Sequence, residues 1–170
     1  MMHIRTATAG DAALMSRIHA LSWKSAYPGM VPQQYLDELR LDFWESSFTE
    51  WLSAGTQQGL LIFDGETPAG STVFGPSREV DLPGWGELRT FYLLPEYWGK
   101  GYAQALMERA LQECARSGFE NVYLWALREN ERAQRFYLKC GFQKTDVPYV
   151  VEIMGKQLVD FRFEYRKDAQ

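Results

Sequence analysis

Apolar residues in the first third of the chain recur at steps of three and four, the spacing that places side chains on one face of a helix. Leu14, Ile18 and Leu21 are an example. The same spacing returns twice before the chain reaches Gly55. We therefore expect helices over residues 12–24, from Pro32 onward and over residues 43–52.

Beyond residue 55 the pattern changes to short runs of β-branched, aromatic and aliphatic residues between turn residues. Asp64-Gly65-Glu66 has the composition of a hairpin turn, and Pro148 predicts an irregularity in a later strand. With one short run near the N-terminus, the predicted strands cover residues 4–7, 59–64, 69–75, 87–94, 122–126, 142–154 and 158–165. Helical spacing returns over residues 103–114 and 130–139.

The order of these elements is strand, helices, three strands, helix, strand, helix and two strands. Such an order predicts an α+β protein in which a sheet carries helices. At 170 residues, 46% of them hydrophobic, the chain can bury a core of its own. We expect residues 1–170 to form a single domain.

The junction after the central predicted strand has the features of an anion-binding turn. Pro95 ends the strand, and Gly99 and Gly101 lead directly into the helix that follows. Unpaired N–H groups at a helix N-terminus bind phosphate. A P-loop requires Lys-Ser/Thr after its last glycine, and a dinucleotide turn requires a small residue where this chain has Gln104, so neither pattern fits.

The run Trp98-Gly99-Lys100-Gly101-Tyr102-Ala103 resembles the Gln/Arg-x-x-Gly-x-Gly/Ala signature of the GNAT superfamily of N-acetyltransferases, which use acetyl-coenzyme A (acetyl-CoA). Leu94-Pro95-Glu96-Tyr97 is similar to the segment that leads into it, and Trp98 departs from the usual Gln or Arg. The stretch from Asn130 to Phe142 resembles the second motif of the family, Asn-x-x-Ala-x-x-Phe-Tyr-x-x-x-Gly-Phe.

This resemblance implies the GNAT fold, a mixed and mostly antiparallel sheet flanked by helices. In that fold the central strand and the next strand diverge, and the pantetheine arm of the cofactor lies between them. The resemblance implies no metal. The residues that it implies in binding acetyl-CoA are Phe91, Tyr92, Leu93, Trp98, Gly99, Lys100, Gly101, Tyr102, Ala103, Asn130, Ala133 and Phe136.

Tyr137 is the candidate general acid. On its residue pattern alone it is a packed helical tyrosine. The resemblance reverses this interpretation, because family members use a tyrosine at this position to protonate the departing coenzyme A thiolate. A phenol has a donor strength suited to a thiol of similar acidity.

Glu87 is the candidate general base. An alkylammonium group titrates near 10 and must lose a proton before it can attack. Glu87 lies eleven positions before Trp98, the offset of the general base in the family branch that acetylates histone lysines. A water relay and a solvent-facing Glu87 remain the alternatives. Backbone N–H groups at a bulge near Phe91 and Tyr92 are expected to polarise the thioester carbonyl.

Trp23 and Tyr27 are the candidate acceptor-binding residues. They lie four positions apart on one helix face, where either can pack on the sheet or line a pocket. In the family the acceptor contacts this region and the final hairpin, here about residues 147–154. Trp-x-x-x-Tyr-x-Gly resembles a broad subgroup that includes small-molecule and polyamine-type acetyltransferases, but membership of that subgroup does not name the acceptor. The aromatic residues of this region suggest a confined site, which favours a small-molecule amine.

Composition excludes several other classes. The net charge of −4 argues against nucleic acid as a partner. Two cysteines and two histidines give no metal-ligand spacing, and Cys114 and Cys140 are expected to be buried thiols. No apolar run reaches the ~20 residues of a membrane span, and the first residues lack a signal-peptide pattern, which predicts a cytoplasmic protein.

Three alternatives to a small-molecule acetyltransferase stay open at this point. They are a protein or peptide N-acetyltransferase, a non-catalytic acyl-CoA sensor and, more weakly, an ATP-binding protein. The predicted last strand contains Phe161 to Tyr165 and is a candidate sheet edge, which suggests a homodimer.

Overall fold

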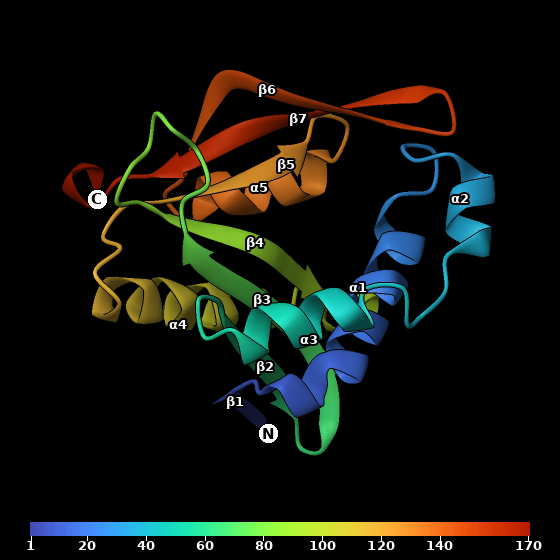
Figure 1. Ribbon diagram of the computed structural model, residues 1–170, viewed down its shortest axis with the longest axis horizontal. Helices are drawn as coiled ribbons and strands as arrows, with labels where there is room; N and C mark the ends of the chain where they lie inside the picture. The colour runs from blue at the N-terminus through green and yellow to red at the C-terminus, as the bar shows by residue number, and fades with distance from the viewer.

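A computed structural model describes residues 1–170 and contains one seven-stranded sheet in the order β1-β2-β3-β4-β5-β7-β6 (Figure 1). The β4–β5 pair is parallel and every other pair is antiparallel. The predicted mixed, mostly antiparallel α+β fold is therefore confirmed. The strands are β1 (Met2–Thr6), β2 (Gln58–Asp64), β3 (Thr67–Pro76), β4 (Gly86–Leu93), β5 (Val122–Leu127), β6 (Gln143–Ile153) and β7 (Lys156–Tyr165).

Helices cover both faces of the sheet, as the alternating side chains of β2 require. Leu60 and Ile62 join a core cluster with α4 (Tyr102–Arg116) on one face. Leu61 and Phe63 join a second cluster with α1 (Ala12–Ala26) and α3 (Glu45–Ser53) on the other face. Successive side chains of a strand point to opposite faces of the sheet, and here both faces are covered. The sequence of β2 is therefore a continuous apolar run.

A smaller cluster joins the first helices to the end of the β6–β7 hairpin. Leu36 of α2 (Gln33–Glu38) packs with Val31, Leu127 and Leu158. Lys156 Nζ also donates a hydrogen bond to the carbonyl of Met30 at 2.6 Å. Figure 1 shows α2 and the tip of this hairpin on the same side of the molecule. The contact closes one end of the space between α1 and the sheet.

Most predicted elements are present with ends that differ by a few residues. The helix from Pro32 is only six residues long, and α5 (Glu131–Lys139) begins after Asn130. The irregularity predicted near Pro148 is a register shift between Lys144 and Pro148. Helix α4 ends before Gly118, whose φ of +91° suits a glycine at a helix end.

The prediction that the last strand is a sheet edge is wrong. Strand β7 lies between β5 and β6, so its backbone pairs on both sides, and the edges are β1 and β6. The expectation for Cys140 is also corrected, because its side chain is half-buried whereas Cys114 is buried. No helix combines the length and apolar character needed to cross a bilayer.

Candidate functional site

Strands β4 and β5 pair over only two residues before they separate. Gly86 pairs with Val122 and Glu87 with Tyr123, and no further pair follows. A cavity of about 370 Å³ opens between the two strands beyond this point. Its walls include every residue from Leu88 to Leu93 and every residue from Leu124 to Leu127. The backbone edge of β4 that faces β5 is therefore available to a ligand.

A β-bulge in β4 lies at the start of this opening. Val73 of β3 pairs with Thr90 and Phe74 pairs with Leu88, which leaves Arg89 as the extra residue. The bulge expected near Phe91 and Tyr92 is therefore about two residues earlier. Its position follows from Thr90, whose Oγ1 accepts the Val73 N–H at 3.0 Å and replaces a ladder bond.

The turn into α4 presents a row of free backbone donors. None of the N–H groups from Gly99 to Gln104 donates to a backbone acceptor. Gly99 and Gly101 have φ of +71° and +89°, a conformation that side chains with a Cβ rarely adopt. The donor set and the positive end of the α4 dipole suit a pyrophosphate.

Trp98 connects this turn to the end of β4. Its indole N–H donates to the carbonyl of Leu93 at 2.9 Å, and the guanidinium of Arg132 lies 3.5 Å from its ring centroid. Trp98 therefore connects the turn both to the end of β4 and to Arg132 of α5. Arg132 lines the cavity and was not predicted, although it lies two positions after Asn130 in the second motif.

Helix α5 places one side of the second motif against the cavity. Asn130 Oδ1 accepts the Ala133 N–H at 3.3 Å and caps the helix. Tyr137 is only 8% exposed, and its ring lies edge-on to Phe91 with centroids 6.3 Å apart. Burial raises the pKa of Tyr137 above its usual value, so the phenol keeps its proton near pH 7.

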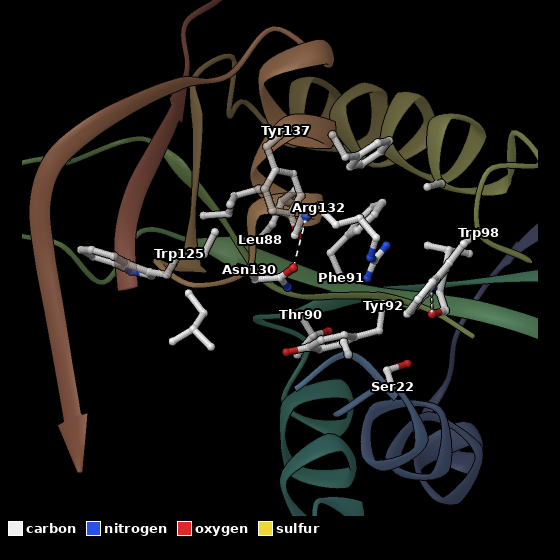
Figure 2. A pocket seen from close by; sticks show the side chains of 18 of the residues that line it. Ser22, Leu88, Thr90, Phe91, Tyr92, Trp98, Trp125, Asn130, Arg132 and Tyr137 are labelled. Atoms are coloured by element: carbon white, nitrogen blue, oxygen red, sulfur yellow. Dashed lines mark hydrogen bonds between the residues drawn. The ribbon is translucent and has the colours of Figure 1, made fainter. Parts of the chain in front are cut away.

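Figure 2 shows how these side chains lie around the cavity: Trp98 and Trp125 are at opposite ends of the view, and Tyr137 and Phe91 are between them. Ser22 of α1 approaches from the side of Tyr92. Ser22 Oγ and Arg89 Nε are buried without a hydrogen-bond partner, and both residues line the cavity. Unpaired buried donors are costly, so these atoms suit a polar ligand such as the pantetheine arm of coenzyme A.

A second cavity of about 450 Å³ adjoins the first. Trp23, Tyr27 and Val31 contribute one wall, and Tyr149, Val151 and Ile153 of the β6–β7 hairpin contribute another. The residues that line both cavities are Tyr27, Leu88, Arg89, Tyr92, Trp125 and Leu127. The two cavities therefore meet at β4, in the region where the cofactor arm was expected.

Glu87 lines the second cavity, but its carboxylate is already engaged. Arg78 donates to both oxygens, Nε to Oε1 at 2.9 Å and Nη2 to Oε2 at 2.7 Å. The hydroxyl of Tyr123 donates to Oε1 at 2.9 Å. Because Glu87 is 2% exposed, the alternative of a solvent-facing charge is wrong.

The structure brings most of the predicted residues together. Lys100, Gly101 and Tyr102 are outside the wall of the first cavity and belong to the donor row of the turn. The first cavity is lined by Phe91, Tyr92, Leu93, Trp98, Gly99, Ala103, Asn130, Ala133, Phe136, Tyr137 and Tyr27. Trp23 and Glu87 line the second cavity.

Sequence reasoning missed several residues of both cavities. Trp125 and Asp160 lie on β5 and β7, and neither belongs to a motif. Asp160 is one of three charged residues at alternate positions of β7, with Arg162 and Glu164, so no local signal distinguished it. No group of three or more His, Cys, Asp or Glu side chains has an arrangement that could hold a metal.

Comparison with known proteins agrees with this geometry. The model of the Acetyltransferase (GNAT) family matches residues 18–142. An uncharacterised N-acetyltransferase of Mycobacterium tuberculosis H37Rv is 49% identical over 136 residues, which cover 78% of this chain and 83% of the relative. The spermidine N(1)-acetyltransferase of Thermoplasma acidophilum is 25% identical over 157 residues, which cover 92% and 97% of the two chains.

Solved structures show the same fold. The PaiA N-acetyltransferase of Thermoplasma acidophilum, crystallised with coenzyme A, superposes with a TM-score of 0.80 at 22% identity and covers 98% of this chain and 99% of that one. A Salmonella typhimurium acetyltransferase with acetyl-CoA superposes with a TM-score of 0.72 at 22% identity and covers 99% and 95%. The chain belongs to the GNAT family and is an acetyl-CoA-dependent N-acetyltransferase.

Proposed function

We propose that this enzyme transfers the acetyl group of acetyl-CoA by direct attack of a primary amine of a small molecule. The observation that carries the proposal is the pair of adjoining cavities that share Tyr92 and Leu88. The second cavity, about 450 Å³, has the volume of a small-molecule site. The similarity to a spermidine acetyltransferase supports the same class of acceptor.

The residues of the first cavity would hold acetyl-CoA in an extended form. The free N–H groups from Gly99 to Gln104 would receive the pyrophosphate, and the unpaired edge of β4 would receive the pantetheine arm. When bound, acetyl-CoA supplies an acetyl group activated as a thioester. Backbone donors at the Arg89 bulge would polarise a carbonyl that reaches the junction of the cavities.

Two groups would handle protons in this mechanism. Tyr137, protonated near pH 7, would give its proton to the thiolate that leaves. The amine must lose a proton before attack, and Glu87 or a water relay is the candidate acceptor. Arg78 donates hydrogen bonds to both oxygens of Glu87, which favours another acceptor over Glu87.

The test is thiol release from acetyl-CoA against a panel of small amines, with wild-type protein and Tyr137→Phe. We expect release with one class of amine and a fall in kcat of about 100-fold in the variant, the usual contribution of a general acid. Ligand-induced melting shifts with acetyl-CoA should be the same in both proteins. Phe142→Leu, a change of a ring that packs on Tyr137 but lines neither cavity, serves as a control for aromatic packing.

Two outcomes would contradict the proposal. Acetylation of peptides but not of small amines would show the protein-modifying alternative. A melting shift with acetyl-CoA but no thiol release with any amine or peptide would show a non-catalytic sensor.

A further inference from the structure

The second cavity contains a half-buried carboxylate that has no partner in the protein. Asp160 lies on β7, where its cross-strand neighbours are Leu127 of β5 and Tyr149 of β6. Directly opposed residues of antiparallel strands share a face, so all three side chains border the same cavity. The carboxylate makes no hydrogen bond and no ion pair with the protein, and burial is what shifts its pKa. An unpaired and partly buried charge is costly and marks a candidate functional site.

Aromatic rings surround the space in front of Asp160. The rings of Trp125 and Tyr149 have centroids 5.7 Å apart on the sheet side. Those of Trp23 and Tyr27 are 5.0 Å apart on the α1 side. A carboxylate among aromatic faces is the arrangement that binds an alkylammonium group, through an ion pair and cation–π contacts together.

The Asp160 carboxylate also lies near the junction of the two cavities. Its charge raises the pKa of Tyr27 and of Tyr92, after the larger effect of their burial. Both tyrosines line both cavities. A nitrogen bound to Asp160 would therefore lie close to the place where the acetyl group is expected.

Two groups of ion-paired residues lie near this cavity, and two further charged residues line it. Glu87 and Arg78 neutralise each other, and Arg162, two positions further along β7, is paired with Asp81 and Glu164. Arg89 of β4 and Glu79 of the loop before β4 line the cavity. The titratable groups that line the cavity with Asp160 from the end of α1, from β4 and from β6 are the phenols Tyr27, Tyr92 and Tyr149, together with Glu87 and Arg89 of β4.

Resting on the proposed function, we propose that Asp160 binds the ammonium group of the acceptor and takes its proton, so that the acceptor is a cationic alkylamine. One N–H proton passes from the ammonium to the carboxylate, which leaves a neutral amine with a free lone pair. That lone pair forms the amide C–N bond as the thioester C–S bond breaks. The sulfur leaves with the proton of Tyr137, the second N–H proton restores Tyr137, and Asp160 releases its proton to water.

The protonation of Asp160 agrees with this role. Burial raises the pKa of Asp160 to about 6, which brings it closer to the pKa of an amine than an exposed carboxylate would be. The folded-state pKa is thus above that of the unfolded chain, about 3.9. The contribution of Asp160 to stability is full below pH 4 and is lost as the pH rises through 6. At pH 7.5 the ionised Asp160 therefore destabilises the fold.

The first experiment measures binding without acetyl-CoA. Quenching of tryptophan fluorescence is followed with hexylamine, hexanol and hexanoate, three probes of one chain length and different charge. We expect wild-type protein to prefer hexylammonium, and Asp160→Asn to weaken that binding roughly tenfold or more, as the loss of a charge-assisted hydrogen bond implies. Asp146→Asn, the same change at an exposed position of β6, is the matched control and should bind as the wild type does.

The second experiment measures turnover and stability. For any amine that the wild type acetylates, kcat/KM for that amine should fall by about 100-fold in Asp160→Asn, and the acidic limb of its pH profile near 6 should disappear. The melting temperature of Asp160→Asn should be higher than that of the wild type at pH 7.5, and the two should converge near pH 4. If Asp160 had only a structural role, Asp160→Asn would lower the melting temperature at pH 7.5.

In the binding experiment, three results would overturn the inference. They are equal binding of all three probes, a preference for hexanoate through Arg89, or unchanged binding of hexylammonium by Asp160→Asn. Turnover that survives Asp160→Asn with the same pH profile would also overturn it and would leave the proposed function standing. Selective ammonium binding that depends on Asp160, without thiol release from any amine, would instead contradict the proposed function and support the binding role.

Discussion

Burial shifts several titratable side chains in and around the two cavities toward their uncharged forms, among them Tyr137, Asp160 and His19. It raises the pKa of Tyr137, raises that of Asp160 to about 6 and lowers that of His19 to about 3. Near pH 7 the phenol therefore keeps its proton and the imidazole is neutral. Only Asp160 of the three titrates close to physiological pH, so its charge is the one that a change in pH or a bound cation can alter.

We expect His19 to lower the folding stability of the protein in acid. Its ring is buried, and the ring centroids of Trp44 and Tyr92 lie 4.1 Å and 4.5 Å from its own. In the unfolded chain the ring binds a proton below pH 6.5, whereas in the folded chain it does so only near 3. The stability present above pH 6.5 is thus lost as the pH falls, at roughly 1.4 kcal/mol per pH unit.

Urea unfolding between pH 7.5 and 4.5 tests this prediction in the wild type and in His19→Met, an apolar replacement that suits an aromatic site. The urea midpoint should fall more steeply with acid in the wild type. Parallel curves for the two proteins would show that His19 does not govern acid stability.

The contacts of a single residue could be predicted where its partners are close in the chain, and could not be predicted where they are distant. Asn130 caps α5, and Asn is one of the residue types that most often cap a helix N-terminus. The partners of Glu87 could not be predicted, because Tyr123 lies 36 positions further along the chain and Arg78 lies in a loop. Such contacts depend on which strands become neighbours, and a local pattern does not contain that information.

At the scale of elements, the β4 bulge depends on one buried hydroxyl. Thr90 Oγ1 accepts the Val73 N–H, and Thr90 is 5% exposed. We expect Thr90→Val to leave that N–H unpaired and to cost about 1–3 kcal/mol in the free energy of unfolding. Denaturant unfolding measures the cost, and the KM for acetyl-CoA should rise because the bulge shapes the cavity wall.

Thr90→Ser is the matched control, because it keeps the hydroxyl and removes only a methyl group. It should retain most of the stability and the wild-type KM. Equal destabilisation by both substitutions would attribute the effect to packing of the methyl group and not to the hydrogen bond.

Periodicity predicted the helices and strands and their order, since each depends on residues close in the chain. It did not predict the lateral order of the strands. Strand β7 was expected at an edge, yet β6 folds back along its outer side, a pairing that depends on residues at the far end of the hairpin. The position of the bulge was missed for the same reason, because it depends on the register with β3.

For the whole molecule, binding of coenzyme A should alter hydrogen exchange in a defined pattern. We expect slower amide exchange at residues 88–93 and 99–104, where the strand edge and the turn have free donors. The β1–β2 pair, which lies far along the sheet from the cavity, should be unaffected. Exchange measured by mass spectrometry with and without coenzyme A checks this, and binding without protection at these residues would contradict the placement of the cofactor.

The short ladder between β4 and β5 also bears on how long each molecule survives. Two residue pairs make up the whole ladder that joins strands β1 to β4 to strands β5 to β7 within the sheet. A cofactor that bonds along this opening would join the two halves of the sheet, and a ligand that binds only the folded state stabilises it. We therefore expect the protein to be most susceptible to thermal unfolding and proteolysis when no cofactor is bound. Its lifetime would then depend on the supply of acetyl-CoA.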